Sequence, residues 1–406
     1  MSSQTPEIIA AINAVRLEAF GSNEVERLQV RAAARRLLAR VETPYERARG
    51  FSLEHPLVFA ALQTCIDLGI WKSWTGAGGG EKSIHELVQL ATASVDTNLL
   101  RRLFRLLAAF NVVEESAEDS FKPTEFSFAI GDESTKVRAS LQAAANQYIA
   151  AARNLPAYLA KIGYMEPTNA NENNYTDIDP DGLTCFARLQ NSSSYLETFI
   201  DHMEAATARK TPWTKVYDTA KLLEGTKLED GSPFVVDLGG NTGTDISHVL
   251  VRHPDLPQGS LILQDLPEII SGLKVDSKIT AMAHDFFLPQ PVKGLAINAR
   301  STGSRAYFLH AVLHDWPDDK AMQLLVNTRH AMVKGYSKLF IYDMVILPTG
   351  ASISQATLDV EMMALLSSSE RTQSAWEKLL ADSGFRIIKF WPDPQRYEML
   401  IEAEVA

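Results

Sequence analysis

The chain has 406 residues, of which 46% are hydrophobic and 22% are charged, a balance typical of a globular protein with sizeable cores. Its net charge of −11 opposes the binding of nucleic acid, and no apolar run reaches the roughly 20 residues that span a bilayer. We therefore expect two domains, a cytoplasmic location, and no nucleic-acid or membrane partner. Cys65 and Cys185 lack the spacing of a metal site, so two reduced, packed thiols are expected.

Residues 1–225 form a predicted helical domain. Ser83 and Glu86 predict a capping box at the start of one helix, and Asp96 caps a second helix whose leucines fall on one face. A hairpin-like stretch, "VVEESAEDSFKPTEFSF", follows. This order is typical of a winged helix, but its wing is acidic where phosphate contacts would be needed. We therefore expect a packing or dimerisation module, and not a DNA-binding one.

A change of pattern near residues 223–232 predicts a domain boundary, with the second domain at 226–406. Short β-branched or aromatic runs then alternate with helical stretches, beginning with "PFVVDL", "SLILQ", "RAYFL" and "KLFIYDMVI". This alternation predicts a parallel sheet with crossover helices, and therefore an α/β domain that follows the helical one.

A glycine turn follows the first strand of this domain, in "FVVDLGGNTGTD". Gly239, Gly240 and Gly243 permit a tight turn, but Asn241 stands where a dinucleotide fingerprint has its second glycine. Asp237 would oppose a pyrophosphate and suits an ammonium group. The turn therefore predicts a cationic cofactor in place of a nicotinamide, although by itself it is equally compatible with a structural connection.

Two further strands of the predicted sheet also end in an acid. Asp265 closes "SLILQD", where an acid can reach ribose hydroxyls, and Asp285 and Phe286 in "AHDFF" can contact an adenine. Each acid alone could be a helix cap, but ligands of open α/β sheets bind at the carboxyl ends of strands. Three such acids in a row favour a nucleoside-bearing cofactor.

The stretch "YFLHAVLHDWPDD" carries two histidines, His310 and His314. A metal site would need both on one face of a helix with an intervening Glu, and that Glu is absent, so no metal is predicted. Pro317 suits the first turn of a helix that starts after His314 and leaves its imidazole exposed at the strand tip. His314 could then act as a general base or serve only in the structure.

Taken together, "VVDLGGNTG", "LQDLPEI", "HDFFLPQPVKG", "LHAVLHDWPDD" and "ERTQSAWEKLLADSGF" resemble the S-adenosylmethionine-dependent O-methyltransferases of the caffeate or plant and fungal secondary-metabolite type. The resemblance implies a class I methyltransferase sheet, Rossmann-like, whose last strand is antiparallel. The stretches "FRIIKFW" and "RYEMLIEAEV" can form that terminal hairpin. It also implies a winged-helix-like domain that forms a homodimer.

The resemblance further implies the site and its roles. S-adenosylmethionine would be the cofactor, a small aromatic or polyketide-type metabolite would accept the methyl group, and His314 would be the base, oriented by Glu370 with Asp343 as a second supporting acid. The remaining expected positions contact the cofactor: Gly239 and Gly240 at the methionine part, Asp265 at the ribose, Asp285 and Phe286 at the adenine, and His310 nearby. Asp237 and Leu266 are further expected cofactor contacts.

The acceptor pocket is expected to use helices that follow the polar connector at 167–182. In "SYLETFIDHMEAA", His202 and Met203 could face the acceptor or pack, and core packing is expected for Met203.

Two features depart from the family pattern, namely an apparent insertion at 295–304 and an Asp at position 343, where Glu is common. Some fungal members of the fold catalyse pericyclic reactions or dehydrations instead, and a cofactor-binding regulator without activity is a third possibility. Intact His314, Asp315 and Glu370 favour methyl transfer.

Overall fold

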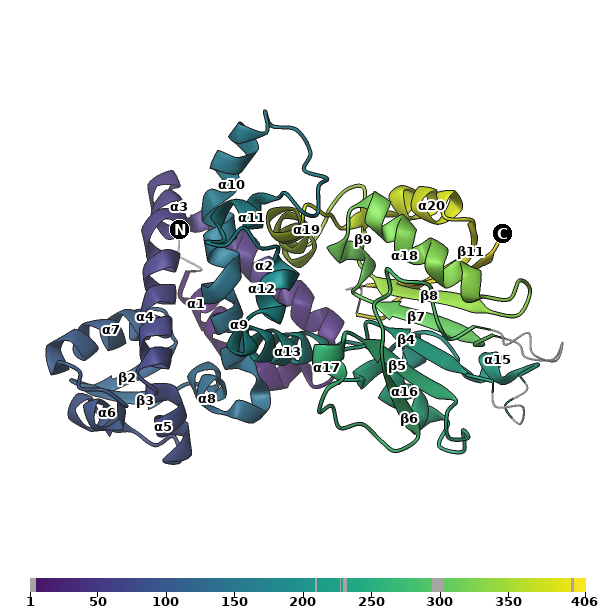
Figure 1. Ribbon diagram of the computed structural model, residues 1–406. Helices are drawn as coiled ribbons and strands as arrows, with labels where there is room; N and C mark the ends of the chain where they lie inside the picture. The colour runs from purple at the N-terminus through teal and green to yellow at the C-terminus, as the bar shows by residue number, and fades with distance from the viewer. Residues whose placement is uncertain (1–4, 209, 227, 229–231, 294–302, 396–397) are drawn as a thin grey trace.

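The computed structural model of the protein describes residues 5–208, 210–226, 228, 232–293, 303–395 and 398–406. A helical N-terminal part lies beside a sheet that is flanked by helices (Figure 1). Residues 295–302 of the predicted insertion at 295–304, and residues 227 and 229–231 of the predicted boundary at 223–232, lie outside the described residues. Among the described residues, no helix combines the length and the apolar character needed to cross a membrane.

The N-terminal part consists mainly of helices. They are α1 (Thr5–Ala14), α2 (Glu24–Val41), α3 (Pro44–Arg49), α4 (His55–Asp67), α5 (Ile70–Gly76), α6 (Ile84–Leu90), α7 (Thr97–Ala109), α8 (Glu125–Gly131), α9 (Val137–Ala143), α10 (Ile149–Lys161), α11 (Asn174–Ile178), α12 (Cys185–Gln190), α13 (Ser193–Thr207), α14 (Trp213–Val216) and α15 (Ala220–Leu223).

The predicted helix pair and hairpin are present in this part. The capping box at Ser83 and Glu86 starts α6, and the Asp96 carboxylate accepts a hydrogen bond from Leu99 N at 2.9 Å at the start of α7. Strands β1 (Lys82–Ser83), β3 (Ser120–Pro123) and β2 (Val113–Ala117) form a small antiparallel sheet. Arg101 on α7 pairs with Asp119 of the hairpin at 2.7 Å, so the wing neutralises a basic residue of the would-be recognition helix.

The C-terminal part is built on a seven-stranded sheet with the order β6-β5-β4-β7-β8-β12-β11. The strands β4 to β8 in this sheet are parallel, and β12 is antiparallel to both of its neighbours, which confirms the predicted fold class. The strands are β4 (Val235–Leu238), β5 (Leu261–Asp265), β6 (Ile279–Ala283), β7 (Ala306–His310), β8 (Lys338–Asp343), β11 (Phe385–Pro392) and β12 (Met399–Val405).

Further helices and a separate two-stranded parallel sheet complete the C-terminal part. The helices are α16 (Thr244–Arg252), α17 (Pro267–Ile270), α18 (Asp318–Ala331), α19 (Ile353–Leu366) and α20 (Gln373–Asp382), and the pair is β9 (Val345–Ile346) with β10 (Arg371–Thr372).

Two contacts join the parts in ways that the sequence pattern did not predict. The Trp213 ring on α14 stacks on Phe308 of β7 with 4.6 Å between ring centroids, so α14 packs on the sheet although it precedes the predicted boundary. In the other direction, α19 packs among the N-terminal helices, where the buried Asn174 side chain donates to Ala151 O and Ala364 O. Cys65 and Cys185 are buried free thiols, as predicted.

Candidate active site

A cavity of about 390 Å³ opens between the carboxyl ends of the parallel strands and helices α12 and α13. The carboxyl ends of neighbouring parallel strands meet at one edge, which is where the fold places a ligand. All eight residues that the sequence predicted at the cofactor line this cavity: Asp237, Gly239, Gly240, Asp265, Leu266, Asp285, Phe286 and His310.

The glycine turn after β4 forms part of the cavity wall. Gly239 has a φ of 71°, a conformation that side chains with a Cβ rarely adopt. A Cβ on Gly240 would lie 2.5 Å from Asp237 Oδ2. That oxygen is buried without a hydrogen-bond partner among the described residues, and burial, followed by the neighbouring Asp245 charge, raises the pKa of Asp237 well above its ordinary value. A cationic ligand would relieve both conditions.

The next two strand ends hold their acids by backbone hydrogen bonds. Asp265 accepts from Asn241 N and from Leu266 N, both at 2.8 Å, so its carboxylate links the glycine turn to the end of β5. Burial raises the pKa of Asp265 nonetheless. Asp285 accepts from Phe287 N at 2.9 Å. These bonds fix the two carboxylates at the cavity wall, where each retains acceptor capacity for a ligand hydroxyl or amine.

His310 ends β7 between two carboxylates. Its Nδ1 lies 2.6 Å from Asp245 Oδ2, and its Nε2 lies 3.2 Å from Glu398 Oε2. Burial alone would lower the pKa of His310, but Asp245 and Glu398 outweigh it and raise that pKa to about 9. Lys210 completes the cluster, with Nζ 2.5 Å from Glu398 Oε1. Asp245 has no predicted role, although an acid in the first turn of the helix after the glycine loop was a visible signal.

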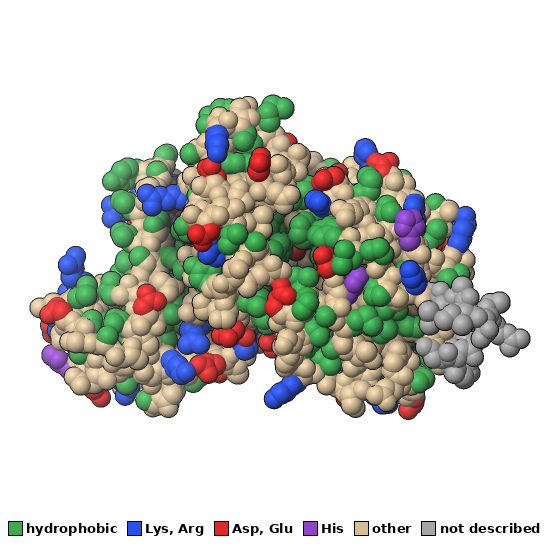
Figure 2. Space-filling model, viewed as in Figure 1, with side chains coloured by type: hydrophobic (Ala, Val, Ile, Leu, Met, Phe, Trp, Pro, Cys, Tyr) green, Lys and Arg blue, Asp and Glu red, His purple; other side chains and the backbone are tan. Residues whose placement is uncertain are grey.

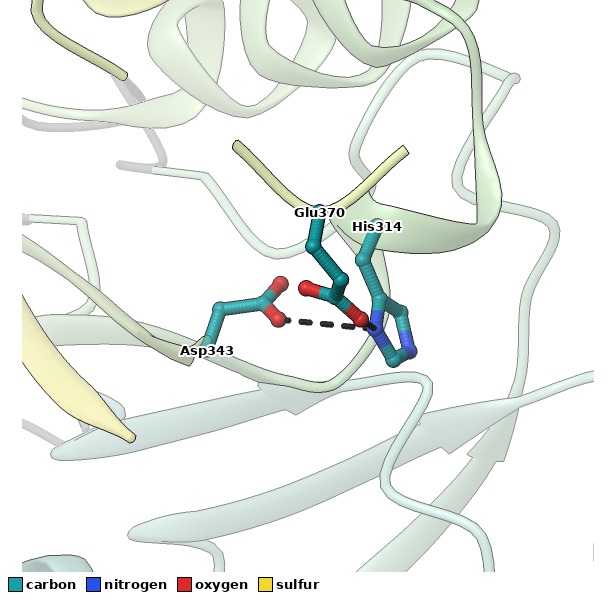
Figure 3. A group of neighbouring side chains, drawn as sticks. All are labelled: His314, Asp343 and Glu370. Carbon is teal, nitrogen blue, oxygen red and sulfur yellow. Dashed lines mark hydrogen bonds and ion pairs between the residues drawn. The ribbon is translucent and has the colours of Figure 1, made fainter. Parts of the chain in front are cut away.

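His314 lies in a short turn at Leu313–Asp315, just before α18, which begins at Asp318. Its Nδ1 lies 2.6 Å from Glu370 Oε1 and 3.6 Å from Asp343 Oδ1 (Figure 3). The structure therefore brings together the three residues predicted as base and supporting acids. The prediction of an exposed imidazole was wrong, because His314 is only 9% exposed.

Carboxylates surround the His314 imidazole on both sides. Burial would lower its pKa, but Asp343, Asp315 and Glu370 outweigh burial and raise the pKa of His314 to about 10. Asp315 Oδ1 lies 3.5 Å from Nε2, and Asp315 also lines the cavity, whereas His314 is not among the described lining residues. Burial raises the pKa of Asp315 to about 7 and that of Glu361, on α19, to about 7 as well. Glu361 has no predicted role.

His314, Asp343 and Glu370 are also the described residues whose ligand atoms lie close enough together, within 4.8 Å, to hold a metal ion. The 2.6 Å contact between Nδ1 and Glu370 Oε1 is the length of a charge-assisted hydrogen bond, which uses the nitrogen that a metal would need. We therefore interpret the group as an imidazole held by acids.

Aromatic and apolar side chains form the other wall of the cavity. The Phe186 ring stacks on Trp316 at 5.5 Å, and Phe199 and Met203 on α13 also line the space. The expectation that Met203 packs in a core was wrong. His202 packs instead, with Nδ1 3.0 Å from Ser140 Oγ. Because a cavity wall and a core are both apolar, the helical pattern could not distinguish them.

Comparisons with known proteins agree with this geometry. The O-methyltransferase domain family matches residues 213–386. O-methyltransferase ATR12 of Stachybotrys chlorohalonatus is 42% identical over 405 residues, which cover 100% of each chain. A solved structure of a LepI variant in complex with SAH and a substrate analogue has a TM-score of 0.87 at 25% identity and 100% coverage of both chains.

Another solved structure, described as a pericyclic reaction enzyme, has a TM-score of 0.87 at 25% identity, and the match covers 98% of this chain and 100% of the other. The family match, the full-length relative and the strand-end cavity lead to one assignment: the chain belongs to the S-adenosylmethionine-dependent O-methyltransferases.

Proposed function

We propose that the protein methylates a hydroxyl group of a small aromatic or polyketide-type metabolite, with His314 as general base. The observation that carries the proposal is the 2.6 Å pair of His314 and Glu370 beside a cavity that unites every predicted cofactor residue. The Phe186 and Trp316 rings support a flat acceptor, because stacked aromatic walls favour planar ligands.

The residues of the strand-end cavity suit S-adenosylmethionine. We infer that Asp237 and the glycine turn hold its amino-acid end, Asp265 its ribose, and Asp285 with Phe286 its adenine. The orphaned Asp237 oxygen and the place of Gly239 and Gly240 in the cavity wall support the first of these roles. When bound, this cofactor supplies an electrophilic methyl group, so the chain itself must orient the acceptor and remove its proton.

We expect Gly240→Ala to weaken binding of S-adenosylhomocysteine by about tenfold or more, since overpacking costs about 1–3 kcal/mol. The added methyl group would meet Asp237 Oδ2 at 2.5 Å and would also overlap Leu263 Cδ1. Isothermal titration calorimetry measures the effect. Gly76→Ala is the matched control, because no atom lies within 4 Å of a Cβ at that position. Equal affinity in both variants would contradict this use of the glycine turn.

His314 can move the proton because its two ring nitrogens have different surroundings. When the imidazole is neutral, Nδ1–H donates to Glu370 Oε1, which leaves the Nε2 lone pair as an acceptor. Nε2 and Asp315 Oδ1, 3.5 Å apart, form the face that an acceptor hydroxyl would meet. After transfer, the imidazolium is stabilised by Glu370, Asp343 and Asp315.

The test is turnover of methyl-labelled S-adenosylmethionine against a panel of phenolic and polyketide acceptors, with and without a metal chelator. Transfer of label to an acceptor oxygen, unchanged by the chelator, is the expected result. An active panel member whose turnover stops with the chelator would contradict the metal-free mechanism.

Pericyclic or dehydration chemistry is a second candidate function, supported by the similarity to the pericyclic reaction enzyme and by the raised pKa of His314. An imidazolium donates hydrogen bonds and stabilises charge, but it cannot accept a proton. Replacing the cofactor with a sulfonium analogue that lacks a transferable methyl group separates the two functions. Product formation that survives the replacement would establish the second candidate and exclude methyl transfer as the activity.

We also propose that the protein is a homodimer through its N-terminal helices. Helices α1, α2 and α3 bury none of their residues within the chain. Figure 2 shows apolar side chains on the surface of the N-terminal part. On α1, the side chains of Ile8 and Ile12 are about half exposed. Helices of this length gain most of their stability from burying an apolar face, and a second copy of the chain can supply the partner.

Substituting both Ile8 and Ile12 with Glu is expected to convert the dimer to a monomer, because two charges would be buried in an apolar contact. Light scattering coupled to size-exclusion chromatography measures the mass. Val251→Glu is the control, since this 80% exposed side chain lies on α16 in the C-terminal part. An unchanged mass in the double variant would exclude α1 from the interface.

A further inference from the structure

The charged cluster of Lys210, Asp245, His310 and Glu398 comes from four separate segments of the chain. Asp245 lies in the first turn of α16, His310 ends β7, Glu398 precedes β12, and Lys210 follows α13. The side chains of His310 and Glu398 are 7% and 5% exposed. A buried set of charges persists only when each charge is compensated, so the protonation of His310 decides the balance.

The contacts of His310 favour the doubly protonated imidazolium. Both ring nitrogens lie at hydrogen-bond distance from a carboxylate oxygen, and an ionised carboxylate only accepts. A neutral ring could donate to one of them alone. Lys210 Nζ also lies 3.4 Å from His310 Nε2, but Glu398 Oε2 is closer to that nitrogen, at 3.2 Å. Lys210 itself pairs with the other Glu398 oxygen, Oε1. With two cations and two anions, the cluster is neutral.

This arrangement leaves His310 without a donor for a ligand. Both of its N–H groups are committed to protein carboxylates, although the residue lines the cavity. Asp245 is different, because only Oδ2 is bonded to His310, and Oδ1 has no hydrogen-bond partner among the described residues. Asp245 lines the same cavity as Asp237 and the glycine turn. The cluster therefore offers the cavity a carboxylate and not an imidazole.

We propose that Asp245 binds the ammonium group at the amino-acid end of the cofactor, and that His310 and Glu398 are positioning residues that hold the Asp245 carboxylate in place. This inference rests on the proposed function, which supplies the cofactor. Under this proposal, the neighbouring acids Asp237 and Asp245 have different roles. Asp237 is the deeply buried acid whose pKa burial raises, whereas Asp245 is held by His310 through Oδ2 at 2.6 Å and can offer Oδ1 to the ligand.

Calorimetric titration of the purified protein tests the proposal with two ligands. S-adenosylhomocysteine carries the amino-acid end, and 5′-methylthioadenosine lacks it. Asp245→Asn is expected to weaken binding of the first by roughly ten- to hundredfold, the usual range for a lost charged hydrogen bond, and to leave binding of the second within about twofold. Asp255→Asn, the same change at an exposed position, should affect neither ligand.

Variants at His310 separate a positioning role from a merely structural one. His310→Lys restores a cation and should keep the affinity for S-adenosylhomocysteine within about threefold of wild type, whereas His310→Gln should weaken it about tenfold. In the double variant with Asp245→Asn, the two losses should not add, because both act through Asp245. At saturating cofactor, kcat should change much less than the affinity in each case.

Several outcomes would overturn the inference. They are equal weakening of both ligands by Asp245→Asn, unchanged binding of S-adenosylhomocysteine, and equal losses in His310→Lys and His310→Gln. If Asp245→Asn lowers the unfolding temperature too far for titration, Glu398→Gln replaces it, with the same selective loss expected for S-adenosylhomocysteine. Failure of the wild-type protein to bind S-adenosylhomocysteine would instead overturn the proposed function.

Discussion

Replacing His314 with Gln is expected to lower kcat for methyl transfer by about a thousandfold, within the usual range for loss of a general base. Gln can hold the hydrogen bond to Glu370, but it cannot take the acceptor proton. Because His314 is separate from the cofactor residues, the affinity for S-adenosylhomocysteine should not change. Initial rates with labelled methyl donor, together with calorimetry, measure both quantities.

The control for this variant is His330→Gln, at an exposed position on α18, which should retain full activity. The acceptor provides a second check. A phenol that is already ionised at the assay pH has no proton to lose, so His314→Gln should impair its methylation far less. A variant equally poor with both kinds of phenol would show that His314 supports the structure and does not remove the proton.

The second large effect is expected at Glu370. Glu370→Gln should lower kcat about a hundredfold at pH 9, because Gln can donate to Nδ1 and so place the imidazole proton on Nε2, the nitrogen that must accept. In the wild-type enzyme, the carboxylates raise the pKa of His314 to about 10, so kcat/KM should rise with pH and level off near that value. Removing one carboxylate lowers the pKa of His314 and moves the plateau to lower pH.

Rate profiles from pH 6 to 10.5 with an acceptor of fixed ionisation test this shift. Glu377→Gln on α20, at an exposed position, is the matched control and should keep the wild-type profile. A plateau at the same pH in Glu370→Gln would mean that Glu370 does not act on the imidazole.

The cofactor side of the site was predictable because local sequence determines it. Asp237, Asp265 and Asp285 each lie at or just after the end of a strand, and the order of strands in an α/β sheet brings such ends together. The glycine turn is equally local. All of these residues line one cavity, as their spacing alone implied.

The parts of the fold and site that the sequence did not predict depend on contacts between distant segments. Lys210 and Glu398 meet across 188 residues, and no periodic pattern records which charged residues become buried partners. In the sequence, Trp213 looks like any apolar residue before a polar linker. Only the structure shows that its ring stacks on Phe308. The burial of His314 was missed for a similar reason. Its neighbours in sequence include several acids, but the surrounding Glu370 and Asp343 arrive from other strands and loops.

The insertion of α19 among the N-terminal helices has a consequence for engineering this enzyme. The Asn174 amide holds α10 and α19 together through two carbonyl oxygens, and Asp359 on α19 accepts a hydrogen bond from Glu370 N at 2.9 Å. A chimera that takes only its N-terminal helices from a relative would therefore pair α10 with a foreign α19. The junctions of a chimera should therefore be chosen so that α10, α19 and the loop from α19 to Glu370 all come from the same protein.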